Sequence, residues 1–364
     1  MRKALIVATI GGFLPVSEIN NAKLLQDLGF EVHYAANMKN KIYEYDEQKL
    51  IDAGIVLHHV EFSKNPFRFV KLYKCVQEVK DIIENQQIEV VHCHTPVGGV
   101  VGRLSAYFAK LNPTVIYTAH GFHFYKGASI LNWILYYPVE YMLSAITDCI
   151  VTINKEDYKC AQKMRSKKVI QIPGVGIDLK RFIPAEKKLH DEFRIISVGE
   201  LNENKNHSTI IRAISNLNDP GIVYEIYGNG PLKEELEAYI KKLGLEHQVF
   251  LRGFEIEIER KIKDADCCIF PSYREGLGLA ALEAMACGVP LIASDNRGTR
   301  EYMQHEINGI VCHPDDVQGF EKAIYRIKND KALAERMVWE GRQTVQNFSV
   351  EKSTAVMRAL YETI

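Results

Sequence analysis

The sequence predicts an α/β protein built from two doubly wound domains, each with a parallel β-sheet between helices. Short apolar segments rich in β-branched residues alternate with longer segments in which apolar residues recur every three or four positions, the pattern of repeated βαβ units. This alternation starts again near residue 194. A chain of 364 residues also exceeds what one hydrophobic core usually serves, so two domains are expected.

Short apolar segments mark the strands of the two expected sheets. Those of the first sheet are 4–9, 31–35, 55–60, 90–92, 115–118, 149–152 and 169–172. Those of the second are 194–198, 223–227, 249–251, 267–270, 290–293 and 309–311. Helical periodicity covers 19–28 and 70–85 in the first domain, and 232–243 and 321–328 in the second.

Glycine, proline and charged residues indicate where the first domain ends. Pro173-Gly-Val-Gly and the polar stretch after it predict domains at 1–175 and 191–347, joined by a linker at 176–190. The last segment, 348–364, predicts a helix that could pack on either domain, and packing back on the first is the expected arrangement. Ligands of doubly wound domains bind beyond the carboxyl ends of the strands, so two such domains facing each other would share a cleft.

Composition narrows the class of protein. Residues 1–188 carry 24 Lys and Arg against 18 Asp and Glu, whereas the remainder carries 21 against 28. A basic first half suits an anionic surface or a lipid-linked phosphate, with chance scatter as the simpler alternative. The eight cysteines include no C-x-x-C pair, which predicts reduced, buried thiols rather than disulfides or a zinc site. Residues 1–12 lack a signal-peptide cleavage site, so we expect a cytoplasmic protein.

The strongest local pattern is the segment 271–290. An expected strand ends at Phe270, a loop with two glycines follows, and a helix is expected from Leu279. Glycine lets the backbone approach a ligand closely, and the free N–H groups that begin a helix attract anions such as phosphate. The segment therefore predicts a phosphate-binding turn.

Two glutamates, Glu275 and Glu283, lie eight positions apart around this turn. A carboxylate accepts paired hydrogen bonds from neighbouring hydroxyl groups, so a sugar and a ribose are plausible partners. Each residue also has a structural alternative. Glu275 could cap the following helix, and Glu283 could be an exposed charge on its surface.

The segment resembles the E-x7-E signature of glycosyltransferase family 4, a family of retaining transferases with the GT-B fold of two facing Rossmann-like domains. The resemblance covers nearly the whole chain. It implies that Glu275 contacts the donor sugar and that Glu283 holds the nucleotide ribose. It also implies that the diphosphate is received by the backbone of the turn, namely Gly276, Leu277, Gly278, Leu279 and Ala280.

A second match to the family follows the first strand of the second domain, at 197–207. Gly199 and Lys205 fit the family pattern, in which the lysine contacts the diphosphate. Glu200 stands where the family usually has an arginine, so either another cation substitutes or Glu200 points away from the ligand. Arg274 and Arg297 are the candidate substitutes.

The first domain contributes a diglycine turn, Gly11-Gly12, directly after its first strand, and the family likeness implies that this turn lines the donor site. Four histidines lie at the ends of two other strands: His92, His94, His120 and His123. By the resemblance, His120 lies near the donor sugar, and His94 and His123 are candidates for the acceptor side. A packed structural role is the alternative for His94.

No metal is expected. The one-residue spacing of the histidines alternates the faces of a strand, and no partner carboxylate is obvious from the sequence. Asp264 and Asp266 spell a D-x-D pattern, but they precede an expected strand rather than follow one. The resemblance likewise implies transfer without a metal cofactor.

The likeness to enzymes of bacterial exopolysaccharide, capsule and O-antigen synthesis implies a UDP-sugar donor and a saccharide acceptor linked to polyprenyl diphosphate. The enzyme would transfer a hexosyl or N-acetylhexosaminyl group with retention, at the inner face of the membrane. The aromatic and apolar segment 122–141 could touch lipid, but the sequence favours a buried helix there.

Other functions remain as alternatives. A noncatalytic sugar-nucleotide-binding protein and a nucleotide-sugar epimerase of the same fold would share much of this pattern. A dinucleotide-dependent oxidoreductase is excluded, because the first strand is not followed by G-x-G-x-x-G. Nothing in the sequence suggests a nucleic-acid partner.

Overall fold

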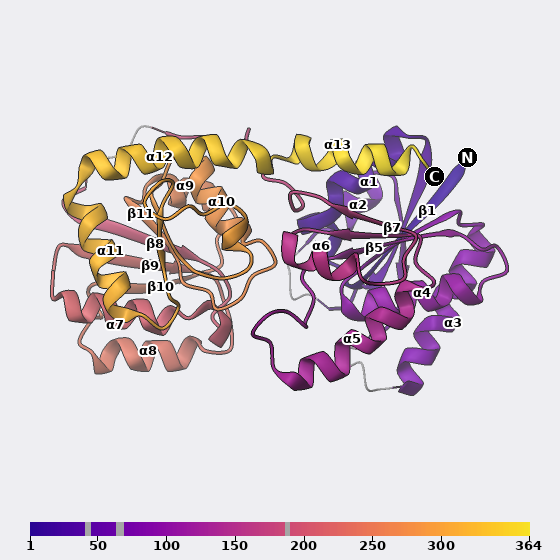
Figure 1. Ribbon diagram of the computed structural model, residues 1–364, viewed down its shortest axis with the longest axis horizontal. Helices are drawn as coiled ribbons and strands as arrows, with labels where there is room; N and C mark the ends of the chain where they lie inside the picture. Colours follow the sequence, from indigo (N-terminus) through magenta and orange to yellow (C-terminus); the bar gives the residue numbers. More distant parts are fainter. Residues whose placement is uncertain (41–44, 63–68, 186–189) are drawn as a thin grey trace. The chain divides into compact units, whose positions relative to one another are not determined.

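The computed structural model describes residues 1–40, 45–62, 69–185 and 190–364 (Figure 1). The chain forms two compact units. Unit 1 comprises Met1–Gly176 and Val350–Ile364, and unit 2 comprises Ile177–Ser349. Each unit holds one parallel β-sheet with helices on both of its faces (Figure 1). The predicted α/β class and the two Rossmann-like domains are confirmed.

Unit 1 contains a seven-stranded sheet in the order β3-β2-β1-β4-β5-β6-β7. Its strands are β1 (Arg2–Ile10), β2 (Phe30–Asn37), β3 (Ile55–His59), β4 (Val90–His94), β5 (Thr114–Ala119), β6 (Cys149–Thr152) and β7 (Lys168–Gln171). Each strand expected from the sequence overlaps one of these. The helices are η1 (Leu14–Glu18), α1 (Ile19–Asp27), α2 (Glu47–Asp52), α3 (Phe69–Gln86), α4 (Pro96–Phe108), α5 (Ile130–Ser144), α6 (Lys155–Ala161) and α13 (Val350–Tyr361).

Strand β1 lies at the centre of this sheet, paired in parallel with β2 on one side and β4 on the other. Its residues Ala4 to Ala8 are completely buried, because helices cover both faces of the sheet. The strand order reverses between β1 and β4. In doubly wound sheets, ligands bind beyond the carboxyl ends of the strands at such a reversal.

Unit 2 contains a six-stranded sheet in the order β10-β9-β8-β11-β12-β13, with the reversal between β8 and β11. Its strands are β8 (Phe193–Val198), β9 (Ile222–Tyr227), β10 (Val249–Gly253), β11 (Cys267–Phe270), β12 (Leu291–Ser294) and β13 (Ile310–Cys312). Its helices are η2 (Glu203–Lys205), α7 (His207–Leu217), α8 (Lys233–Lys242), α9 (Ile258–Lys263), α10 (Leu279–Ala286), η3 (Thr299–Glu301), α11 (Val317–Asn329), α12 (Lys331–Val345) and η4 (Gln346–Phe348).

The segment between the sheets is packed rather than extended. Residues 177–185, which the sequence analysis assigned to a linker, belong to unit 2. Ile177 forms a β-bridge with Ser349, and Phe182 is buried. Arg181 pairs with Glu259 at 2.8 Å. Residues 186–189 of that expected linker lie outside the described residues.

Helix α13 belongs to unit 1 and packs against α1. The Ser353 hydroxyl donates to the carbonyl of Gly174 at 2.6 Å, which ties the start of α13 to the end of the first part of the unit. Tyr361, near its end, is buried and forms a hydrogen bond of 2.8 Å with Nδ1 of His92. The carboxyl end of the chain therefore contributes to the core of unit 1.

Helix α5 differs from its expected burial. The sequence favoured a buried helix, yet Ile130, Leu131, Ile134 and Met142 expose between 62% and 78% of their surface. The reason is that α5 contacts unit 1 along one side, and its buried residues, Glu140, Leu143 and Ser144, all lie near its end. Among the described residues, no helix combines the length and the apolar character needed to cross a membrane.

Candidate active site

In unit 2, the phosphate-binding turn expected from the sequence connects β11 to α10. Gly278 precedes α10 with φ of +91°, a conformation that glycine adopts without strain. A Cβ at this position would lie 2.8 Å from the Phe270 ring and 3.1 Å from the Tyr302 hydroxyl. Gly278 has no capping side chain, so the N–H groups of Leu279 and Ala280 that begin α10 can bind an anion.

Lys205 and Glu275 are brought together beside this turn. Lys205 Nζ lies 2.6 Å from Glu275 Oε1, and both side chains are mostly buried. Lys205 is held at the end of η2, where its N–H donates to the Asn202 side chain at 3.1 Å. Its stem crosses Gly199, where a Cβ would lie only 3.2 Å from the lysine Cδ. The residues predicted from two separate motifs therefore meet at one site.

Glu200 occupies the position where the family usually has an arginine, and it is exposed, accepting a hydrogen bond of 2.9 Å from Asn202. Arg297 is nearly buried, and its Nε donates to the Glu275 carbonyl at 3.2 Å. The Arg274 carbonyl accepts from Asn204 at 2.9 Å. Arg297 thus contacts Glu275 through its guanidinium.

Glu283 lies inside α10 and is partly buried. Burial raises the pKa of this carboxyl to about 7, opposed by the positive charge of Arg181. Its neighbours Leu282 and Ala284 are buried in the core. A carboxyl group in this setting gains from hydrogen-bond donors such as vicinal hydroxyls.

In unit 1, the diglycine turn follows β1. The Gly11 N–H donates to the Asn37 carbonyl at 3.1 Å, and a Cβ at Gly11 would overlap the Tyr45 hydroxyl. Gly12, also buried, leads through Phe13 into the π-helical turn η1. The last residue of η1 is Glu18, whose exposed fraction is 1%. The turn therefore delivers a carboxyl group to the interior.

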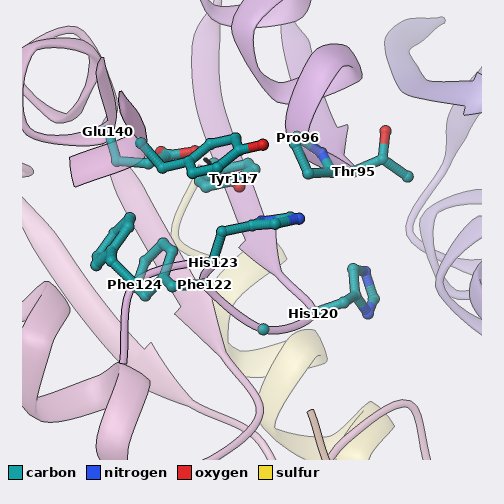
Figure 2. A pocket seen from close by; sticks show the side chains of 10 residues that line it. Thr95, Pro96, Tyr117, His120, Phe122, His123, Phe124 and Glu140 are labelled. Carbon is teal, nitrogen blue, oxygen red and sulfur yellow. Dashed lines mark hydrogen bonds between the residues drawn. The ribbon is translucent and has the colours of Figure 1, made fainter. Parts of the chain in front are cut away.

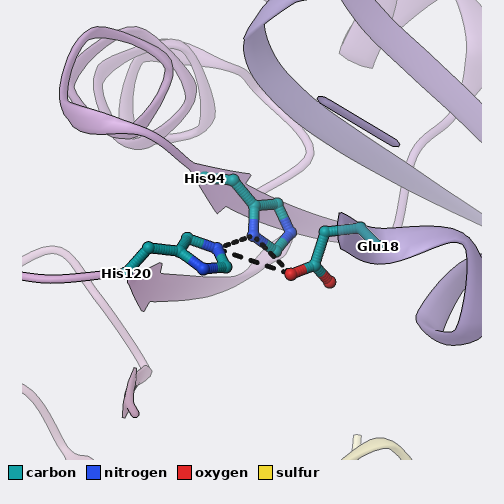
Figure 3. A group of neighbouring side chains, drawn as sticks. All are labelled: Glu18, His94 and His120. Atoms are coloured by element: carbon teal, nitrogen blue, oxygen red, sulfur yellow. Dashed lines mark hydrogen bonds and ion pairs between the residues drawn. The ribbon is translucent and has the colours of Figure 1, made fainter. Parts of the chain in front are cut away.

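Glu18, His94 and His120 converge at the carboxyl ends of β4 and β5 (Figure 3). His94 Nδ1 lies 3.2 Å from His120 Nε2. Glu18 Oε1 lies 3.5 Å from His94 Nδ1 and 3.4 Å from His120 Nε2. The Phe13 ring packs on both histidines, with ring centres at 5.6 and 5.1 Å. We call these three residues the Glu18 triad.

The Glu18 triad is uncharged at neutral pH. Burial raises the pKa of Glu18 to about 8, although the hydrogen bond from Asn21 opposes this. Burial lowers the pKa of His120 to about 4, and that of His94 falls well below its ordinary value for the same reason. The carboxyl group is therefore protonated and both imidazoles are neutral.

Both grounds on which the sequence argued against a metal were wrong. His92 and His94 lie on the same face of β4, with ring centres 4.1 Å apart, and the Glu18 carboxyl group lies beside His94 and His120. The three donor atoms of the triad are close enough to share a metal ion. Metal-bound histidines almost always donate their second ring N–H to a partner. The second ring nitrogen of His94, Nε2, is buried and has no hydrogen-bond partner among the described residues. The surroundings of His94 thus lack the support that a metal ligand usually has.

A pocket of unit 1 is lined by residues of the loop after β5, including His120, and by residues of neighbouring elements (Figure 2). Its lining includes Thr95, Pro96, Tyr117, His120, Phe122, His123, Phe124, Tyr136 and Glu140. His123 stacks on Tyr136, with ring centres 4.6 Å apart. The loop is held by Asp157, which accepts a hydrogen bond of 3.1 Å from the Phe122 N–H. His92 lies deeper, bonded to Thr118 and Tyr361.

Glu140, one of the residues that line this pocket, belongs to a buried ion pair. Arg103 is fully buried and its Nη1 lies 2.8 Å from Glu140 Oε2. The Tyr117 hydroxyl donates to Glu140 Oε1 at 3.2 Å, and the guanidinium lies 4.0 Å from the centre of the Tyr117 ring. Glu140 thus has a permanent cation as its partner, unlike Glu18.

Sequence reasoning missed Glu18, Thr95 and the Arg103–Glu140 pair as site residues. Thr95 adopts φ of +63°, which is strained for a β-branched residue. Its hydroxyl lies 2.6 Å from that of Thr9, a contact across the ends of β1 and β4. The one local signal was Thr95-Pro96, a typical start of a helix.

Comparisons with known proteins agree with this architecture. Residues 180–344 match the family model described as glycosyl transferases group 1, and residues 13–154 match glycosyl transferase 4-like. EpsD of Bacillus subtilis (strain 168), a protein assigned to the glycosyltransferases, is 35% identical over 99% of this chain and 96% of its own length.

Two further proteins are similar to nearly the whole chain. The Escherichia coli UDP-Gal:α-D-GlcNAc-diphosphoundecaprenol α-1,3-galactosyltransferase is 26% identical over 93% of this chain and 90% of its own. Anabaena HepE, solved in complex with UDP-glucose, shares the fold with a TM-score of 0.81 at 18% identity, covering all of both chains. The chain therefore belongs to the group 1, family 4-like glycosyltransferases and has their GT-B fold.

Proposed function

We propose that this glycosyltransferase moves a hexosyl or N-acetylhexosaminyl group from a UDP-sugar to a lipid-linked saccharide acceptor, with retention of configuration, in bacterial surface polysaccharide synthesis. The observation that carries the proposal is the Lys205–Glu275 pair beside the amino terminus of α10. A lysine ammonium, free helix N–H groups and a carboxylate together suit a diphosphate joined to a polyhydroxylated sugar.

The placement of each group in unit 2 supports the following donor roles. The diphosphate binds the N–H groups of the 276–280 turn and Lys205, with Arg297 as the second cation. Glu275 accepts hydrogen bonds from the sugar hydroxyls once the diphosphate draws Lys205 away from it. Glu283 accepts hydrogen bonds from the ribose hydroxyls. The HepE complex with UDP-glucose supports a UDP-sugar as donor.

The reaction needs stabilisation of the departing diphosphate more than it needs a protein nucleophile. The leaving phosphate takes the proton of the acceptor hydroxyl on the same face of the sugar, and His120 lies near the donor sugar. The cations of unit 2 supply the charge that a metal ion would otherwise provide, so transfer proceeds without a metal cofactor.

The acceptor binds at unit 1, where the pocket beside His94 and His123 offers aromatic surfaces for sugar rings. The exposed apolar residues of α5 suit contact with a lipid surface at the inner face of the membrane. The diphosphoundecaprenol-linked acceptor named for the Escherichia coli relative supports this assignment.

The test is a panel of UDP-, GDP- and ADP-sugars, each with and without a polyprenyl-diphosphate-linked saccharide. We expect nucleoside diphosphate release from one UDP-sugar, dependent on the acceptor and unchanged by EDTA. The anomeric configuration of the product, read by NMR from its ¹H–¹H coupling, must match that of the donor. Tight UDP-sugar binding without turnover on any acceptor would favour the noncatalytic alternative, and inversion would refute retention.

A further inference from the structure

We propose that Glu18 and His94 are positioning residues that hold His120 in the tautomer protonated on Nδ1, so that its outer nitrogen donates a hydrogen bond. The geometric part stands on unit 1 alone. The catalytic consequence rests on the proposed function, in which His120 faces the donor sugar.

The first step is the proton of His94. Its Nε2 is fully buried without a hydrogen-bond partner among the described residues. Buried N–H groups without an acceptor are rarer in native proteins than buried acceptors without a donor, so the ring proton is expected on the nitrogen that has a partner. The His94 proton therefore resides on Nδ1, the nitrogen that faces His120 at 3.2 Å.

The second step is the proton of Glu18. Its Oε2 accepts a hydrogen bond of 2.6 Å from Asn21, which leaves Oε1 facing the two histidines. Among the described residues, no lysine or arginine lies within ion-pair distance of this buried carboxyl. A buried carboxyl without a cation is protonated, so Oε1 carries a hydroxyl that points toward His120 Nε2 at 3.4 Å.

The third step combines the two donors. His94 Nδ1–H and the Glu18 hydroxyl both face the lone pair of His120 Nε2, so His120 must carry its own proton on Nδ1. That nitrogen lies on the other side of the ring. The His120 side chain is 23% exposed and lines the pocket of Figure 2, whereas its two partners are sealed from water.

The arrangement is sensitive to alkaline pH. The groups facing Glu18 from neighbouring elements are His94 on β4, His120 after β5, Tyr34 on β2 and Tyr361 on α13. His92 lies next to His94, with ring centres 4.1 Å apart. All are neutral, since burial lowers the pKa of the histidines and raises that of the tyrosines. The Glu18 pKa of about 8 is therefore the first titration above neutrality. An ionised Glu18 accepts rather than donates, which draws the His120 proton to Nε2.

Unit 1 contains a matched group for comparison. Glu31, His33 and His58 form a second Glu–His–His chain, with contacts of 2.8 and 2.9 Å. Glu31 is partly exposed and its pKa is lowered by hydrogen bonds from Lys3 and His33. This carboxylate is ionised throughout the neutral range, so Glu31→Gln is the control for Glu18→Gln.

The experiment uses the full chain labelled with [¹⁵N]histidine. Long-range ¹H–¹⁵N spectra report the tautomer of each ring between pH 6 and 10, and His120→Asn assigns the signal of His120. We expect Nδ1–H at pH 7 and a shift toward Nε2–H with a midpoint near 8. Glu18→Gln, whose amide still donates, should abolish the shift, and Glu31→Gln should leave it intact. Removing His94 by His94→Phe should give a mixture of tautomers.

Activity provides the second readout. Wild-type kcat should fall about tenfold between pH 7 and pH 9, since a group with pKa near 8 is about one-tenth protonated at pH 9. In Glu18→Gln, kcat should no longer fall between pH 7 and pH 9. An Nε2–H tautomer at pH 7, no change up to pH 10, or a metal ion found at the triad by elemental analysis would overturn the proposal. The spectra require no turnover, so they stand even if the proposed transfer reaction fails.

Discussion

The candidate donor site of unit 2 and the Glu18 triad of unit 1 hold their carboxyl groups in opposite ways. In unit 2, Glu275 faces Lys205 at 2.6 Å and has Arg297 against its backbone. In unit 1, Glu18 faces two neutral histidines and is more deeply buried. Both sites lie at the carboxyl ends of parallel strands, so the difference arises from the residues and not from the fold.

The different partners of Glu275 and Glu18 suit the two carboxyl groups to different tasks. Glu275 has a cationic side chain, Lys205, as its partner at 2.6 Å, and the same ammonium group can turn to a diphosphate. Histidine partners leave Glu18 dependent on the proton concentration, so the triad can change its hydrogen-bond pattern near neutral pH. Unit 2 is therefore suited to holding charge, and the triad to placing a proton.

The largest effect should come from removing the cation of a buried carboxyl in unit 1. Arg103→Met leaves Glu140 buried without a cation, which should destabilise the protein by about 4 kcal/mol. For a unit of this size, the melting temperature should fall by roughly 10 °C. Thermal unfolding followed by calorimetry measures the change.

The double variant Arg103→Met/Glu140→Leu separates charge from packing. It should recover most of the lost stability, because no unpaired charge remains. Arg252→Met is the control. It breaks a 2.7 Å ion pair with Glu225 in which the arginine side chain is exposed to solvent, so the expected loss of stability is small. If the melting temperature of the double variant fell as far as that of Arg103→Met, Arg103 would stabilise the unit through its packing alone.

The next effect concerns donor turnover in unit 2. Lys205→Met should lower kcat/KM for the UDP-sugar by about 100- to 1,000-fold, because the departing diphosphate loses the positive charge that stabilises it. Glu275→Gln should also reduce turnover, with folding unchanged by calorimetry. Steady-state kinetics checks both variants against Glu225→Gln, a carboxylate of the same unit away from α10. A loss confined to stability would remove Lys205 from the reaction.

The two sites also differ in how far the sequence predicted them. Gly199 and Lys205 lie within seven residues of each other, and the 275–283 segment is continuous, so local motifs were enough to select the residues of the candidate donor site. The partners of Glu18 and Arg103 lie 76, 102 and 37 positions away. Such pairs form only through the order of strands in the sheet, which periodicity does not determine.

Helix α5 shows the same limit for burial. Its apolar composition is that of a core helix, and hydrophobicity alone does not reveal which neighbours cover it. Likewise, the polar residues after Gly176 resemble a linker, but the pairing of Ile177 with Ser349 depends on a segment 172 residues later. Strand positions were predictable because each is set by its own short run of β-branched residues.

A smaller effect on stability should distinguish two glycines of unit 2 that both have a positive φ. Gly278 and Gly244 both have positive φ, but a Cβ at Gly244 would meet nothing within 4 Å. Gly244→Ala should therefore cost only the backbone strain, about 1–2 kcal/mol. Gly278→Ala should cost more, since it also presses on Phe270 and Tyr302. Denaturant unfolding measures both costs, and a raised KM for the UDP-sugar should appear only in Gly278→Ala. Equal KM values would remove the turn from donor binding.

The smallest effect tests the proposed contact of α5 in unit 1 with lipid. Leu131→Ser/Ile134→Ser on α5 should weaken partition onto phosphatidylglycerol–phosphatidylcholine vesicles by about tenfold, because two exposed apolar side chains no longer enter the lipid. Phe254→Ser/Ile256→Ser in unit 2 removes two residues of similar exposure and should leave partition unchanged. Vesicle co-sedimentation measures both. Equal losses in the two variants would assign the effect to general surface hydrophobicity, and α5 would then need another partner for its exposed face.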